Sequence, residues 1–200
     1  MTTDLVPFVQ PSSSGQPLEF EDYYKLKQSC VEGKSTDTRN LLLVQLYFGT
    51  GLRLSEVMNL TPEHVQQNGP DVSIWIQRGK RQLVKGPQDK YEAVPLGRML
   101  GASLLDYARG NQVGRNKQIF QMTPRRVQQI LAELGIRALG RSVNSRDFRK
   151  LYIRFLLLER GLPIEVVAKM VGHTNTATTM KYYFDLTQEQ RKEINQSIPV

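Results

Sequence analysis

Residues 161–182 read GLPIEVVAKMVGHTNTATTMKY, and this stretch is the most informative in the chain. Apolar residues before Gly172 recur at helical spacing, and glycine is typical of helix ends. A second helix is predicted over residues 175–184. The two predicted helices therefore meet near His173. Tyr182 lies on the second helix, nine residues after the histidine.

Two arginine-bearing segments precede this stretch. Residues 145–150 read SRDFRK and open a predicted helix, on which Arg146 and Arg149 lie three residues apart and so share one face. Residues 46–60 read LYFGTGLRLSEVMNL, in which a glycine-bearing turn separates an apolar helix from a short polar one. This turn places Arg53 at a helix start, where a planar guanidinium can reach two oxygens of one phosphate.

The rest of the chain predicts a mainly helical domain with one small three-stranded antiparallel sheet. Apolar periodicity defines the helices, and alternating apolar residues on either side of a turn-prone GPQD sequence define the strands. Residues 1–17, rich in proline and serine, are expected to form a flexible arm or linker. The predicted helices span residues 18–32, 38–48, 55–60, 97–108, 124–134, 145–160, 163–171 and 175–184, with a tail helix at 187–196 and strands at 72–76 and 91–96.

The charge balance favours a polyanionic partner. Lysine and arginine number 27 against 19 aspartates and glutamates, which gives a formal net charge of +8. Cys30 is the single cysteine and His64 and His173 are the two histidines, so we expect neither a disulfide framework nor a metal site. The sequence also has no membrane-length apolar run and no signal peptide, and we expect a cytoplasmic protein without a cofactor.

The ordered set of motifs resembles the catalytic domain of the tyrosine recombinases, the phage-type integrase family. The resemblance covers residues 18–186. It implies the tyrosine recombinase (DNA breaking-rejoining) fold, and an enzyme that cuts and rejoins DNA through a 3′-phosphotyrosine without metal or nucleotide. Taken singly, each motif is compatible with an ordinary surface arginine, a helix-end histidine or a core tyrosine.

The resemblance also implies a role for each residue. Three arginines would bind the scissile phosphate and stabilise its transition state, and His173 would donate a hydrogen bond to a nonbridging oxygen. Tyr182 would attack the phosphorus, with Tyr183 as the alternative nucleophile. The three arginines are Arg53, Arg146 and Arg149.

Arg146 departs from the family pattern, and the position of the lysine leaves alternatives open. Arg146 stands where the family usually has histidine, and a guanidinium does not release its proton in a protein, so the base for the tyrosine proton is unassigned. The family's general-acid lysine lies in the hairpin that follows the first arginine block. Lys80, in the sequence Arg-Gly-Lys, fits that place best, and Lys85 and Lys90 are the alternatives.

The partners implied are double-stranded DNA and further copies of the chain, assembled as a dimer or tetramer on DNA, with no membrane or small-molecule substrate. Residues 187–200 would form a tail helix that can be exchanged between subunits. Residues 1–200 are not expected to include the family's N-terminal DNA-clamping domain, which would make the chain a fragment or leave residues 1–17 to act in its place. A prokaryotic or viral mobile element is the expected origin. Candidate phosphate-tracking residues are Arg98, Arg125, Arg126, Arg137 and Arg141.

Two other functions remain open at this point. Type IB topoisomerases and telomere resolvases resemble this site and share its chemistry. A non-catalytic DNA-binding relative is the other alternative, and Arg146 in place of histidine is the feature that favours it.

Overall fold

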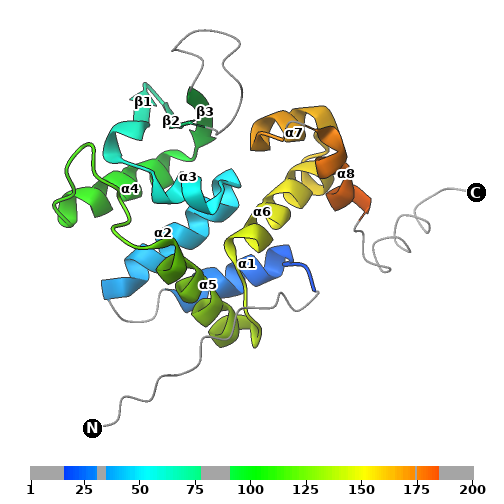
Figure 1. The fold of residues 1–200 in the computed structure, drawn as a ribbon, viewed down its shortest axis with the longest axis horizontal. Helices are drawn as coiled ribbons and strands as arrows, with labels where there is room; N and C mark the ends of the chain where they lie inside the picture. Colours follow the sequence, from blue (N-terminus) through cyan, green and yellow to red (C-terminus); the bar gives the residue numbers. More distant parts are fainter. Residues whose placement is uncertain (1–15, 31–34, 78–90, 174, 185–200) are drawn as a thin grey trace, which may run out of the picture.

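The computed structural model describes residues 16–30, 35–77, 91–173 and 175–184. It confirms a mainly helical domain that carries a small three-stranded antiparallel sheet. Figure 1 shows the sheet beside α4 and the α7–α8 pair at the far end of α6. The helices are α1 (Phe20–Ser29), α2 (Ser35–Thr50), α3 (Leu54–Met58), α4 (Arg98–Gly110), α5 (Pro124–Leu139), α6 (Ser145–Arg154), α7 (Ile164–Val171) and α8 (Thr176–Phe184). A 3-10 turn, η1 (Pro62–His64), precedes the strands β1 (Val65–Asn68), β2 (Asp71–Gln77) and β3 (Tyr91–Leu96), and a π-helical turn, η3 (Phe155–Glu159), follows α6.

Helix α2 runs through the main hydrophobic core. It packs against α1, α4 and α6, so several of its faces are covered. This explains why residues 41–48 of the helix are apolar at every position except Gln45, and not in a single stripe. The predicted helix at 38–48 is confirmed and is longer by about a turn in total. Its buried apolar residues are Leu42, Leu43, Val44, Leu46 and Tyr47.

The sheet is antiparallel, with strand order β1-β2-β3. On β2, buried Val72, Ile74 and Ile76 alternate with more exposed residues, the period-two pattern from which this strand was predicted. Strand β1 was not located from the sequence, because Val65 is the buried residue and the other three are exposed. The hairpin that connects β2 to β3 lies outside the described residues.

Helix α5 extends five residues beyond its predicted end at residue 134. Gly135 lies inside the helix, and a Cβ at this position would come within 2.6 Å of the carbonyl oxygen of Arg141. This glycine therefore permits close packing and does not end the helix. The helix ends at Gly140, whose φ of 68° is the left-handed conformation that glycine adopts at low cost.

Helices α6, α7 and α8 form the part of the fold that carries the C-terminal motifs. The predicted helix at 145–160 is confirmed in extent, although its last turn is π-helical. A second hydrophobic cluster holds α7 against α6 and η3, and it is separate from the main core. Its buried residues are Tyr152, Ile153, Leu156, Leu157, Val167 and Val171.

The segment before α1 is tied to the C-terminal half of the chain. Arg141 donates to the carbonyl oxygens of Gln16 and Pro17 and forms an ion pair with Asp22 at 2.8 Å. The Arg141 side chain is 17% exposed, and these contacts hold the segment before α1 against the domain. Residues 1–15 of the predicted arm and the predicted tail helix lie outside the described residues. Among the described helices, none combines the length and apolar character that a membrane span requires.

Candidate active site

Arg53 is the N-cap residue of α3 and follows the turn that ends α2. Gly51 in this turn has a φ of 61°, and a Cβ here would lie 2.3 Å from Cδ1 of Tyr152, so the turn requires glycine. The backbone N–H of Arg53 donates to Oε2 of Glu56 at 2.7 Å, and Nη1 donates to Oε1 at 2.9 Å. The side chain of Glu56 is 5% exposed and that of Arg53 is 42% exposed. A buried carboxylate therefore orients a guanidinium that reaches the surface.

Arg149 connects α6 to both neighbouring motifs. Its Nη1 donates to the carbonyl oxygen of Gly51, and its Nη2 donates to that of Val171. The Nη2 of Arg53 donates to the carbonyl oxygen of Gly172 at 3.1 Å, across a sequence separation of 119 residues. The two guanidinium groups thus meet at the C-terminal end of α7, where unpaired carbonyls favour a positive charge.

Arg146 lies in the first turn of α6, three residues before Arg149. Its backbone N–H donates to Oδ1 of Asn144 at 2.9 Å, and Asp147 accepts from the backbone N–H of Asn144 at the same distance. This capping box fixes where the helix begins and so which residues share a face. Arg146 is exposed, as a residue that contacts an external phosphate must be.

His173 immediately follows the end of α7. Gly172 takes a φ of 68° and ends the helix, and the backbone N–H of His173 donates back to the carbonyl oxygen of Ala168 at 2.8 Å. The imidazole Nδ1 lies 2.8 Å from Oγ1 of Thr179 on α8. The structure therefore places the histidine next to the acceptor carbonyls of both arginines, as the motif order predicted.

Two parts of the predicted site are only partly covered. Tyr182 lies on α8, nine residues after His173, but its side chain and that of Tyr183 lie outside the described part of the structure. The three candidate lysines in the hairpin also fall outside the described residues. They are Lys80, Lys85 and Lys90.

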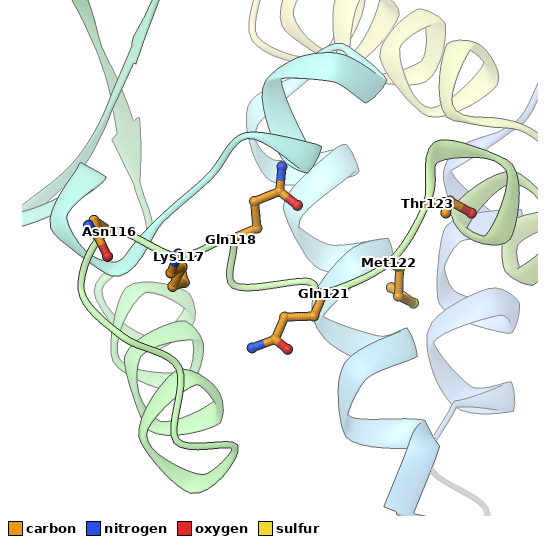
Figure 2. Close-up of a pocket in the computed structure, with 6 residues that line it drawn as sticks. All are labelled: Asn116, Lys117, Gln118, Gln121, Met122 and Thr123. Atoms are coloured by element: carbon orange, nitrogen blue, oxygen red, sulfur yellow. The ribbon is translucent and has the colours of Figure 1, made fainter.

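The arrangement suits an anion with several oxygens. The guanidinium groups of Arg53 and Arg149 reach neighbouring carbonyls at the end of α7, directly before His173 in the chain, and all three side chains can donate hydrogen bonds. Among the described side chains, no group of three or more histidines, cysteines or carboxylates is placed to hold a metal ion. An open hollow elsewhere, on the connection between α4 and α5, contains none of the predicted site residues. Figure 2 shows its lining: Asn116, Lys117, Gln118, Gln121, Met122 and Thr123.

Residues 16–190 match the phage integrase family. The chain belongs to this family. Two integrase-family relatives are tyrosine recombinase XerA of Pyrococcus furiosus, 27% identical over 191 residues, and tyrosine recombinase XerC of Staphylococcus carnosus, 27% identical over 169 residues. The first alignment covers 92% of this chain and 62% of the relative, and the second covers 77% and 52%.

Solved integrase-family structures share the fold. The crystal structure of XerA recombinase superposes with a TM-score of 0.73 at 22% identity, covering 97% of this chain and 68% of that one. The post-cleavage complex of XerH recombinase with palindromic difH superposes with a TM-score of 0.72 at 22% identity. This superposition covers 92% of this chain and 54% of the XerH chain. These comparisons confirm the resemblance and the fold class predicted from the motifs. The chain spans between half and two thirds of the curated relatives named above.

Sequence reasoning missed two residues that contact the candidate site residues. Glu56 stands in the quoted motif, three residues after Arg53, and a carboxylate at this spacing on a helix start was a usable signal for a capping partner. Thr179 gave no such signal, because its contact with His173 depends on how α8 folds back over the end of α7. Of the arginines considered for phosphate tracking, Arg126 pairs with Glu133 at 3.2 Å and Arg137 donates to the carbonyl oxygen of Ser29.

Proposed function

We propose that this chain is the catalytic domain of a site-specific DNA recombinase that cleaves and rejoins DNA through a 3′-phosphotyrosine. The observation that carries the proposal is the convergence of Arg53 and Arg149 on the last carbonyls of α7, next to His173. The fold brings these residues together from three distant parts of the chain. The family relatives named as recombinases support the same chemistry.

The proposed reaction is an in-line transfer. The phenolic oxygen of Tyr182 bonds to the scissile phosphorus, and the bond from phosphorus to the 5′ oxygen breaks. The three arginines stabilise the charge on the nonbridging oxygens, and His173 donates a hydrogen bond to one of them. Lys80 gives its proton to the departing 5′ oxygen. Because one phosphate ester replaces another, a second 5′ hydroxyl can reverse the step without ATP.

The tyrosine proton needs a separate route in this chain. Arg146 cannot accept it, because a guanidinium stays protonated at any physiological pH. We propose that Arg146 acts by charge, favouring the phenolate of Tyr182 or holding a phosphate oxygen, and that the proton passes to water.

The proposed partner is double-stranded DNA, held by several copies of the chain. Solved relatives include XerH recombinase bound to difH and a lambda integrase dimer bound to a core site, and we extend both features to this chain. Residues 187–200 would dock as a helix on a neighbouring subunit, and residues 1–17 would act as an arm. Exchange between two duplexes requires such an assembly. The protein would act in the cytoplasm.

A nicked suicide substrate tests the proposal. A duplex that binds the purified chain is first selected from a random pool. A nick is then placed so that the short fragment that bears the free 5′ hydroxyl diffuses away after cleavage. We expect a covalent protein–DNA adduct, with none formed by Tyr182→Phe and normal amounts formed by Tyr183→Phe. Tight binding with no adduct would overturn the proposal in favour of a non-catalytic relative.

A second readout separates the recombinase from enzymes of the same chemistry. We expect joined products from two duplexes that both carry the selected site. Relaxation of supercoiled plasmid without strand exchange would indicate a type IB topoisomerase, and hairpin ends would indicate a telomere resolvase.

A further inference from the structure

Thr179 is a buried threonine that the proposed mechanism does not use. It lies on α8 with 0% exposure, whereas its neighbour Thr178 is exposed. Its hydroxyl oxygen is 2.8 Å from Nδ1 of His173. A hydroxyl withdrawn from water needs a hydrogen-bond partner, and in the described part of the chain the imidazole is that partner.

We infer that Thr179 is a positioning residue that sets the tautomer and orientation of His173. The inference rests on the proposed role of His173 as a hydrogen-bond donor to the phosphate. When the hydroxyl donates to Nδ1, a neutral imidazole carries its hydrogen on Nε2. The Nε2–H group is then the donor for a nonbridging oxygen. Without the hydroxyl, the neutral ring would divide between two tautomers, one of which has no hydrogen on Nε2.

The backbone around His173 is fixed by the end of α7. Gly172 ends α7 with a φ of 68°, and the His173 N–H donates to the carbonyl oxygen of Ala168. The contact with Thr179 restrains the ring itself. Because Thr179 lies on α8, three residues before Tyr182, the same contact couples the imidazole to the helix that carries the proposed nucleophile.

Three variants at neighbouring positions test this inference in the full chain. Thr179→Val keeps the shape of the side chain but removes the hydroxyl, and we expect single-turnover cleavage to slow about tenfold, the effect of one net hydrogen bond. DNA affinity should not change, because the buried hydroxyl of Thr179 cannot contact DNA directly. Thr179→Ser restores the hydroxyl and should cleave within about twofold of wild type. Thr178→Val is the matched control and should behave as wild type.

Nitrogen-15 NMR of the free protein gives a readout that packing alone would not change. The chain has two histidines, so His64 serves as an internal reference. Its Nδ1 accepts from the backbone N–H of Thr61 at 3.2 Å, which fixes the Nε2–H tautomer. Spectra are recorded near pH 8, above the usual histidine pKa of about 6.5. In wild type and in Thr179→Ser we expect His173 to show the same Nε2–H pattern of nitrogen shifts as His64. In Thr179→Val the Nδ1 resonance of His173 should shift towards the value expected for a mixture of the two tautomers.

The outcomes separate this inference from the proposed function. A wild-type His173 spectrum with hydrogen on Nδ1 would overturn the role of Thr179, as would Thr179→Val cleaving as fast as Thr178→Val. If His173→Ala cleaves as fast as wild type, the proposed role of His173 itself is wrong. If wild type forms no covalent adduct, the proposed function fails whatever the tautomer.

Discussion

The turn at Gly51 offers a stringent test of the site's architecture, through Gly51→Ala. An alanine at a φ of 61° costs about 1–2 kcal/mol, because its Cβ crowds the backbone. Its Cβ would also lie 2.3 Å from the Tyr152 ring, and overpacking of this kind costs about 1–3 kcal/mol more. We expect a loss of unfolding free energy of about 2–5 kcal/mol in total.

Gly69→Ala is the matched control for this prediction. Gly69 has a φ of 59°, and no atom lies within 4 Å of a Cβ built there, so only the backbone penalty of about 1–2 kcal/mol applies. Urea unfolding followed by circular dichroism gives both values. Equal losses in the two variants would refute the close approach of Tyr152 to the turn. Because Gly51 also accepts from Arg149, its variant should lose more DNA cleavage than Gly69→Ala does.

Three further predictions concern the acid, the cysteine and the phosphate contacts. Lys80→Ala should slow DNA cleavage by about 10²- to 10⁴-fold. Its cleavage rate should recover on a substrate with sulfur at the bridging 5′ position, because the sulfur departs without a proton. If the sulfur substrate instead restores the rate of Lys85→Ala, the general acid is Lys85. Burial raises the pKa of the Cys30 thiol to about 11, so the thiol stays protonated near pH 8. Cys30 should therefore resist iodoacetamide until urea unfolds the chain. Fast labelling of Cys30 in native buffer would contradict its burial. Arg146→Ala should reduce the slope of log K against log salt by about 0.9, and an unchanged slope would mean that Arg146 contacts no phosphate.

Much of the fold could be predicted because its helices carry strong local signals. The apolar run of α2, the proline at the start of α5 and the glycine at the end of α7 are readable without tertiary context. Strand β1 could not be located, since one buried residue in four gives no alternation. The end of α5 was placed too early. Gly135 lies inside this helix, where it leaves room for the backbone of Arg141, and that contact is visible only in the folded chain.

The candidate site divides in the same way. Motif order brought Arg53, Arg149 and His173 to one place, and the structure places them at the end of α7. What joins them could not be predicted, because backbone carbonyls and the hydroxyl of Thr179 carry no sequence pattern. The sequence does not distinguish Arg141 from a surface arginine, because its partners at residues 16, 17 and 22 are far away in the chain.

Peptide mapping of the trapped adduct tests the central claim most directly. The adduct from the nicked substrate is digested with nuclease and protease, and mass spectrometry locates the residue that keeps the 3′-linked nucleotide. We predict that the nucleotide is on Tyr182, one turn after Thr179 on the helix that follows His173. A nucleotide on Tyr183, or on any residue outside α8, would contradict the assignment of the nucleophile.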